Sequence, residues 1–194
     1  EALRRPIAIR LVKGAYWDTE VKRAQERGLP AYPVFTRKAM TDLNYEYCAG
    51  KLLACRPRII PQFATHNALT VVFFFNDAAA TENYEFQRLH GMGEALYAKL
   101  GEDRPDIAHR TYAPVGSHRD LLAYLVRRLL ENGANSSFVA LAADEAVPVS
   151  QLLRRPADII GSAENAAHPK IPLPRDLYGP KRKNSRGIEF GERA

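Results

Sequence analysis

The chain has 194 residues, of which 46% are apolar and 26% are charged, and its formal net charge is +6. This composition is typical of a soluble globular domain, and the absence of an apolar run of about 18 residues argues against a membrane-spanning helix. The basic residues are dispersed, and their densest group, residues 181–183, is typical of a solvated tail, so we expect this segment to bind no nucleic acid. Cys48 and Cys55 give neither a disulfide framework nor a metal-ligand spacing, so we expect no metal site.

Short β-rich runs alternate with helical patterns over most of the chain. Four repeats of strand, polar turn and helix predict parallel β/α units, with ligands at the carboxyl ends of the strands. A (β/α)8 barrel needs about 250 residues, so four units amount to half of a TIM-like barrel. A small doubly wound sheet is the alternative, but the glycine-rich phosphate turn typical of that fold is missing. The expected strands are residues 7–12, 58–65, 84–89 and 110–115, and the expected helices are residues 18–27, 36–53, 94–100 and 121–131.

The pattern changes after the fourth unit. Residues 138–147 are apolar with acidic positions, residues 150–155 predict a short helix, and residues 156–167 predict a polar connector. From residue 168 onward, closely spaced prolines exclude a regular helix or a central strand. We therefore divide the chain into a half-barrel, a helical connector and a proline-rich extended arm, at residues 1–140, 141–167 and 168–194.

The fourth expected helix carries two adjacent arginines within apolar sequence. At 3.6 residues per turn, one stripe of this helix contains Tyr124, Arg127, Arg128 and Glu131. A planar guanidinium fits a carboxylate or phosphate through two hydrogen bonds, so this arginine stripe has the chemistry of an anion receptor. The open alternative is an ordinary solvated face in which Glu131 pairs with an arginine. A second, apolar stripe, which we expect to be buried, contains Leu122, Leu125, Val126 and Leu129.

Two further motifs follow expected strands. Alternation in the first strand puts Arg10 and Val12 on one face and Leu11 and Lys13 on the other. An inward-facing arginine needs an anionic or electron-rich partner, and a core-capping salt bridge is the alternative. After the second strand, residues 65–67 offer a hydroxyl, an imidazole and an amide to a polar ligand, although a lone histidine in a loop is more often structural. Tyr16, Tyr112 and Tyr124 either wall an apolar pocket or merely pack.

Six sequence blocks, in this order, resemble the flavin-dependent proline dehydrogenase barrel. They are residues 10–18 (RLVKGAYWD), 32–38 (YPVFTRK), 61–67 (PQFATHN), 84–93 (YEFQRLHGMG), 112–116 (YAPVG) and 124–135 (YLVRRLLENGAN). Residues 168–178 (HPKIPLPRDLY) resemble the segment that joins this barrel to the aldehyde dehydrogenase module in the bifunctional proline utilization A family. The resemblance covers nearly the whole chain but only the C-terminal half of the barrel.

The resemblance implies a role for each matching residue. Arg127 and Arg128 grip the proline carboxylate, with Glu131 orienting the pair, and Leu89, Tyr112 and Tyr124 line the pocket around the proline ring. Arg10 and Val12 lie beside the reactive edge of the isoalloxazine. Three groups of residues match further FAD contacts of the family. The loop that borders FAD matches Lys13, Gly14, Ala15, Tyr16 and Trp17. The motif that meets the phosphates and adenosine matches Thr36, Arg37 and Lys38, and a further FAD contact matches Thr65, His66 and Asn67.

The implied reaction is oxidation of L-proline to 1-pyrroline-5-carboxylate, with hydride transfer to FAD and electrons passing on to a membrane quinone. The N-terminal half-barrel and the downstream aldehyde dehydrogenase module lie outside this chain, so we expect a fragment that is inactive alone. A cytoplasmic location, peripheral at the inner membrane face, fits this activity and the lack of a signal peptide. The rival hypothesis is a non-catalytic β/α scaffold whose arginine stripe docks an acidic partner.

Residues 70–82 (TVVFFFNDAAATE) depart from the family pattern. The stretch is shorter than its counterpart and lacks the helical pattern found there. Three consecutive phenylalanines before a polar run suit neither a surface helix nor a loop. We interpret the stretch as a sequence error or a recombined read, which resequencing of the source DNA would test.

Overall fold

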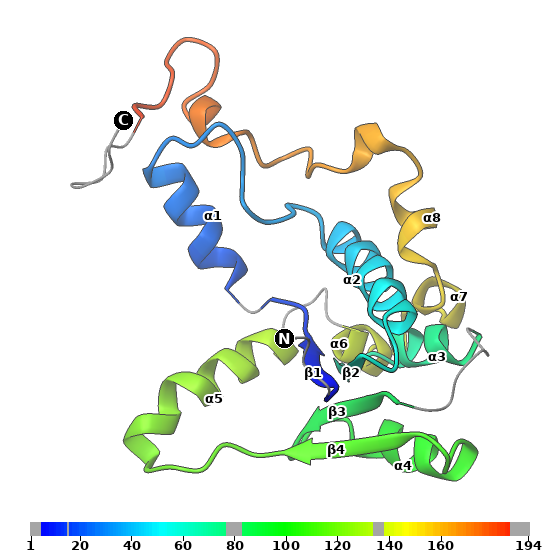
Figure 1. Ribbon diagram of the computed structural model, residues 1–194. Coiled ribbons are helices and arrows are strands. Elements are labelled where there is room, and N and C mark those ends of the chain that lie inside the picture. The colour runs from blue at the N-terminus through cyan, green and yellow to red at the C-terminus, as the bar shows by residue number, and fades with distance from the viewer. Residues whose placement is uncertain (1–4, 15, 77–82, 134–137, 187–194) are drawn as a thin grey trace. The chain divides into compact units, whose positions relative to one another are not determined.

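Figure 1 shows the computed structural model, which describes residues 5–14, 16–76, 83–133 and 138–186. The chain forms two compact units. The first unit combines residues 1–13 with residues 43–154, and the second combines residues 14–42 with residues 155–194. Each unit therefore joins segments that lie far apart in the sequence, and the division into residues 1–140, 141–167 and 168–194 stays a prediction.

The first unit is built on a parallel sheet of four strands in the order β1-β2-β3-β4. The strands are β1 (Ile7–Leu11), β2 (Ile59–Ala64), β3 (Glu85–Leu89) and β4 (Ala108–Tyr112). The predicted α/β class and its four parallel strands are thus confirmed. The order never reverses, unlike the order of a doubly wound sheet.

The fourth strand begins earlier and ends earlier than expected. Residues 113–115 lie outside it, because Pro114 has no backbone N–H for the ladder and Val115 is 97% exposed. Helices follow the strands: α2 (Lys38–Ala54), which begins in the second unit, α3 (Ala68–Asn76), α4 (Glu94–Asp103) and α5 (His118–Gly133). Two short helices, α6 (Phe138–Ala143) and α7 (Val149–Leu152), complete the unit.

The core of this unit lies on the helical side of the sheet. Phe63 of β2 and Phe86 of β3 are neighbours in the parallel register, and both are fully buried. Phe74 of α3 stacks on Phe63 with 4.2 Å between ring centroids and meets Phe86 edge-on at 5.4 Å. Each such ring contributes roughly 1.5–3 kcal/mol by leaving water. The other buried members come from α2, α3 and α4 and from the loops before β3 and β4: Tyr45, Ala49, Leu53, Val71, Tyr84, Tyr97, Leu100 and Ile107.

The stretch that departs from the family pattern is regular where it is described. Residues 70–76 belong to α3, and Val71 and Phe74 are 1% and 4% exposed in the core. The expectation that this run lacks a helical pattern is therefore wrong for these residues. It failed because the helix is largely buried and so has no polar face to mark its period. Residues 77–82 lie outside the described residues.

The exposure of α5 is the reverse of what its composition predicts. The apolar stripe is 50% exposed at Leu122, 42% at Leu125 and 43% at Val126, so the expected burial is wrong for these side chains. The side chain of Leu129 lies outside the described residues. Tyr124, Arg127 and Arg128 are only partly exposed. The arginine stripe, not the leucine stripe, is the more covered of the two, and this disfavours the interpretation of a merely solvated face.

The second unit consists of α1 (Trp17–Glu26), α8 (Pro156–Ile160) and the 3₁₀ turns η1 (Ala163–Asn165) and η2 (Pro174–Asp176). The predicted polar connector therefore contains a helix, α8. The proline-rich arm docks by hydrogen bonds: the Asn184 side-chain amide donates to the Gln25 carbonyl at 2.6 Å, and the Tyr32 hydroxyl donates to the Pro172 carbonyl at 2.8 Å. The arm is thus held against residues 25–32 rather than left as a free extension.

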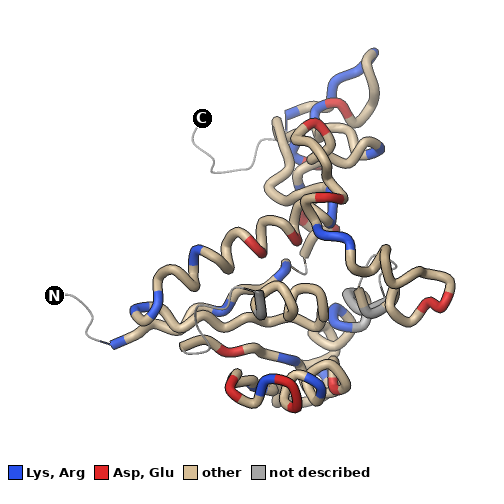
Figure 2. Tube along the Cα trace, turned by 90° about the vertical axis from the view of Figure 1, so that its right-hand side faces the viewer, with Lys and Arg blue, Asp and Glu red and all other residues tan. Residues whose placement is uncertain are grey.

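Lysine and arginine are spread along the described chain and alternate with acidic residues (Figure 2). Within the described ranges, no helix combines the length and the apolar character that crossing a membrane requires.

Candidate functional site

The face of the sheet opposite the core is polar. Because adjacent residues in a parallel register point to the same face, Arg10, Gln62 and Glu85 form one row across β1, β2 and β3. Gln87 and Arg110 form the next row, and Leu89 and Tyr112 form the row at the carboxyl ends of β3 and β4. Three of the predicted site residues, Arg10, Leu89 and Tyr112, therefore lie on this face.

This polar face is concave. The Arg10 guanidinium carbon lies 5.1 Å from the centroid of the Tyr112 ring, although β1 and β4 are the two outer strands of the sheet. Three strand spacings of about 4.8 Å would separate these strands by about 14 Å in a flat sheet. The contact indicates that the sheet curls so that its outer strands approach on the polar side. Arg10 thus meets an electron-rich ring, as the sequence predicted for an inward-facing arginine.

Helix α5 brings the arginine stripe to the same place. The Arg128 guanidinium carbon lies 5.2 Å from the centroid of the Tyr124 ring. Burial raises the pKa of the Tyr112 phenol, and the nearby Tyr124 adds to the rise. The guanidinium groups of Arg10 and Arg128 partly offset this rise in the pKa. Two cations and two phenols from β1, β4 and α5 are therefore gathered in one cluster. The side chain of Glu131 lies outside the described residues.

His66 joins this cluster from the loop after β2. Its Nε2 accepts a hydrogen bond from the Leu89 backbone N–H at 3.1 Å. Burial, then the positive charges of Arg88 and Arg128, lower the pKa of His66 below its ordinary value. The ring is therefore neutral with its proton on Nδ1, so Nδ1–H is the group that can meet a ligand. The structure thus gives His66 a structural bond that does not exclude the predicted cofactor contact.

The short motif after β3 makes room for this histidine. Gly93 has a φ of +65°, and a Cβ there would lie 3.1 Å from His66 Cδ2. A larger residue would be strained by the backbone angle and would crowd the imidazole. The glycine thus leaves room for His66 and allows the left-handed backbone at the start of α4.

Thr65 and Asn67 have local roles. Thr65 Oγ1 accepts from the Asn67 N–H at 3.1 Å, and Asn67 Oδ1 accepts from the Thr70 N–H at 3.3 Å. These bonds satisfy backbone donors at the start of α3. Contacts of these two side chains with a cofactor stay a prediction.

The residues after β1 divide as alternation predicted. Leu11 packs against the core, and Lys13 on the same side donates to Thr70 Oγ1 at 3.2 Å and lies 5.1 Å from the Tyr45 ring centroid. Val12 is 53% exposed. Arg10 and Lys13 therefore serve opposite faces of the sheet.

The second unit holds the remaining predicted cofactor residues. Trp17 Nε1 donates to the Phe35 carbonyl at 2.9 Å, and Thr36 Oγ1 accepts from the His168 N–H at 2.9 Å. Arg37 donates to the backbone carbonyls of Ile159, at 3.2 Å, and Asn165. Lys38 pairs with Asp42. Gly14 and Tyr16 are exposed, and Ala15 lies outside the described residues.

These contacts show a role that the sequence did not indicate. The Arg37 guanidinium, which was predicted to meet cofactor phosphates, donates to backbone carbonyls in this structure. Both carbonyls belong to the connector. The connector therefore holds Arg37, and His168 at the start of the arm holds Thr36. These bonds link segments more than 120 residues apart, which no local pattern could reveal.

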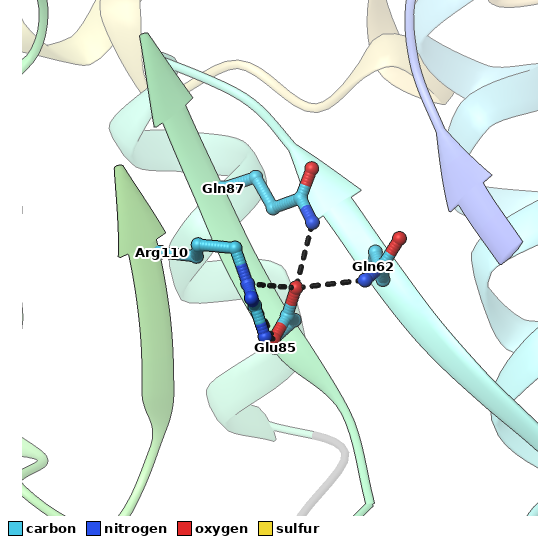
Figure 3. Close-up of polar contacts among 4 residues, drawn as sticks. All are labelled: Gln62, Glu85, Gln87 and Arg110. Carbon is cyan, nitrogen blue, oxygen red and sulfur yellow. Dashed lines mark hydrogen bonds and ion pairs between the residues drawn. The ribbon is translucent and has the colours of Figure 1, made fainter. Parts of the chain in front are cut away.

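A polar cluster on the concave face was not predicted from the sequence (Figure 3). Glu85 Oε1 accepts from Gln62 Nε2 at 2.8 Å, from Gln87 Nε2 at 2.6 Å and from Arg110 Nε at 3.0 Å. Glu85 Oε2 accepts from Arg110 Nη2 at 3.0 Å. The available signal was the strand sequence Glu85, Phe86, Gln87, in which polar residues flank a core phenylalanine at a spacing of two.

The parallel β/α order and the curled polar face define a class of α/β proteins that bind ligands at strand ends. Comparison with known proteins narrows that class. Residues 1–141 match the model of the proline dehydrogenase family, and the chain belongs to that family. The resemblance inferred from the sequence blocks is confirmed.

Several known proteins are similar to this chain over most of its length. The bifunctional protein PutA of Klebsiella aerogenes is 53% identical over 96% of this chain. The mitochondrial proline dehydrogenase 2 of Arabidopsis thaliana is 31% identical over 80% of this chain, and the match covers 33% of the Arabidopsis protein. A crystal structure of proline utilization A from Bradyrhizobium japonicum has 73% identity and a TM-score of 0.91 over 95% of the chain, which covers 19% of that protein. The chain spans 15% of the length of the Klebsiella relative.

Proposed function

We propose that this chain is the C-terminal half of a (β/α)8 proline dehydrogenase barrel within a longer bifunctional protein. The sequential parallel order and the curled sheet support the barrel, since both are what half of a closed barrel would retain. The small share of the relatives that the chain covers supports the larger protein. The whole protein oxidises L-proline to 1-pyrroline-5-carboxylate.

FAD is the implied cofactor, and the donor set of the concave face fits it. Arg10 presents a guanidinium and His66 an Nδ1–H, and these are hydrogen-bond donors suited to the acceptor atoms of a flavin ring. Residues 12–17, 36–38 and 65–67 complete the proposed cofactor contacts, with Thr36, Arg37 and Lys38 toward the phosphates and adenosine. When bound, FAD supplies the acceptor for the hydride lost by proline.

The chain's own contribution to the reaction is binding and positioning. The paired guanidinium groups of Arg127 and Arg128 hold the carboxylate of proline, with Glu131 orienting them. Both arginines are partly buried, and Arg128 lies beside Tyr112 and Tyr124, so less water competes for their ionic bonds with the carboxylate. Leu89 and the two tyrosine rings wall the ring of the substrate. No nucleophile is needed, because a fixed geometry supplies the rate.

The observation that carries this proposal is the convergence of Arg10, Tyr112, Tyr124 and Arg128 from three separate elements. A docking face for an acidic partner would need the arginines of α5 but not Arg10 or the phenols. The resemblance to the family further implies reoxidation by a membrane quinone and a peripheral place at the inner membrane face, and we include both in the proposal.

The test uses the longer protein that contains this segment. Bound flavin absorbance that bleaches when L-proline is added supports the proposal. A colourless protein that does not respond to proline supports the non-catalytic scaffold instead.

A further inference from the structure

The polar cluster of Figure 3, made of Gln62, Glu85, Gln87 and Arg110, lies beneath the proposed proline site. Gln87 and Arg110 occupy the row next to Leu89 and Tyr112, and Glu85 lies two residues before Gln87 on the same face. The cluster therefore lies next to two residues of the proposed substrate pocket, Leu89 and Tyr112, on the same face of the sheet. The proposed reaction assigns no role to the cluster.

Glu85 is the centre of the cluster and is ionised. Burial alone would raise the pKa of its carboxyl group, but the hydrogen bonds from Arg110, Gln87 and Gln62 outweigh burial and hold this pKa below its ordinary value. An ionised carboxylate only accepts hydrogen bonds, so each neighbour must turn a donor toward it.

This requirement fixes the amide of Gln87. Its Nε2 donates to Glu85 at 2.6 Å, so its Oε1 points away from the carboxylate, on the side of the strand ends in Figure 3. Gln87 is 1% exposed, and its Oε1 has no hydrogen-bond partner among the described residues. Buried carbonyl oxygens are almost always paired, so this acceptor requires a donor that the described residues do not provide.

We propose that Glu85 is a positioning residue that acts through Gln87. The Glu85 carboxylate fixes the side-chain carbonyl oxygen of Gln87 as a hydrogen-bond acceptor for the ligands bound on this face, the flavin and proline. The inference rests on the proposed function. It adds a fixed acceptor to a concave face on which Arg10 and His66 present donors. A site with both kinds of group can set the orientation of a ligand that has both.

The test is a double-mutant cycle in the longer protein with Glu85→Gln and Gln87→Met. Gln87→Met keeps the length of the side chain and the ion pair between Glu85 and Arg110 but removes the acceptor. We expect Gln87→Met to raise the KM for proline by about five- to tenfold with a smaller change in kcat, the scale of one lost hydrogen bond. The visible absorption band of the bound flavin should shift as well.

The cycle separates action through Gln87 from an independent structural role. Glu85→Gln should raise the KM in the wild-type background and have little further effect in the Gln87→Met background. Additive effects of the two substitutions would overturn the proposal. If Glu85→Gln does not fold, Gln87→Met decides alone, and an unchanged KM and flavin spectrum would contradict the inference.

Glu102→Gln is the matched control. Glu102 pairs with Lys99 on the exposed side of α4 at 3.3 Å, so removing its charge should leave both KM and spectrum unchanged. The outcomes also separate the two proposals. A wild-type flavin that proline does not bleach overturns the proposed function together with this inference, whereas normal bleaching with an unaltered Gln87→Met variant overturns this inference alone.

Discussion

Arg128 is the residue with the most specific proposed role. Its guanidinium can form two hydrogen bonds with one carboxylate, and lysine offers only a point charge. Arg128→Lys in the longer protein should therefore raise the KM for L-proline by about tenfold or more. Steady-state kinetics with varied proline measures this. Arg119→Lys is the control, because Arg119 is exposed near the start of the same helix, and an unchanged KM in Arg128→Lys would remove Arg128 from the role.

His66 should make stability depend on pH. Its pKa in the folded chain lies below the unfolded value of 6.5, so the unfolded state takes up a proton first as the pH falls. The free energy of unfolding should therefore decrease below about pH 6.5, by no more than about 1.4 kcal/mol at pH 5.5. Above pH 6.5 this contribution is constant.

His66→Gln keeps an acceptor for the Leu89 N–H but cannot titrate. Urea unfolding at pH 7.5 and pH 5.5 should show a smaller loss of stability in this variant than in the wild type. The exposed His118 provides the comparison, since His118→Gln should retain the wild-type pH dependence. Equal losses in His66→Gln and the wild type would show that His66 is not the titrating group.

At the scale of elements, α3 shows why an unusual sequence need not be an irregular structure. Phe74 stacks on Phe63 and meets Phe86, so Phe74→Ala should lower the free energy of unfolding by about 3–5 kcal/mol. Val72→Ala on the same helix should change it by less than about 0.5 kcal/mol, because Val72 is 46% exposed. Chemical denaturation compares the two. Similar small losses would mean that α3 does not pack in this register.

The elements were predictable where the local pattern was strong. All four strands were predicted to within a few residues, because short β-rich runs that end in a polar turn and lead into a helix are typical of parallel strands. Helix α3 was missed because a buried helix shows little periodicity. The apolar stripe of α5 was assigned to the core because periodicity identifies an apolar face without saying which layer covers it.

The candidate site was predictable only in part. The positions of Arg10 and Leu11 on opposite faces followed from alternation, and the structure confirmed them. Three features each join segments more than 20 residues apart: the bond between His66 and the Leu89 N–H, the ion pair of Glu85 with Arg110, and the bonds of Thr36 to His168 and of Arg37 to the connector. Such pairings depend on the register of the sheet and on the path of the chain, which no local pattern specifies.

At the scale of the whole molecule, the sheet ends at two open edges. In the described part, β1 and β4 are edge strands, and Ile7 and Ile9 on β1 are 48% and 37% exposed. Unpaired apolar edges favour association of chains. This chain expressed alone should therefore elute as aggregates in size-exclusion chromatography and show no proline-dependent activity. A monodisperse, active 194-residue chain would contradict the half-barrel.

In the proposed site, Arg127 and Arg128 of α5 hold the carboxylate of proline over the flavin. A crystal structure of the longer protein with FAD and an unreactive proline analogue tests this arrangement most directly. We expect the analogue's carboxylate within about 3.2 Å of nitrogen atoms of Arg127 and Arg128, with Tyr112 and Tyr124 against its ring. A carboxylate bound elsewhere, with both guanidinium groups turned to solvent, would contradict it.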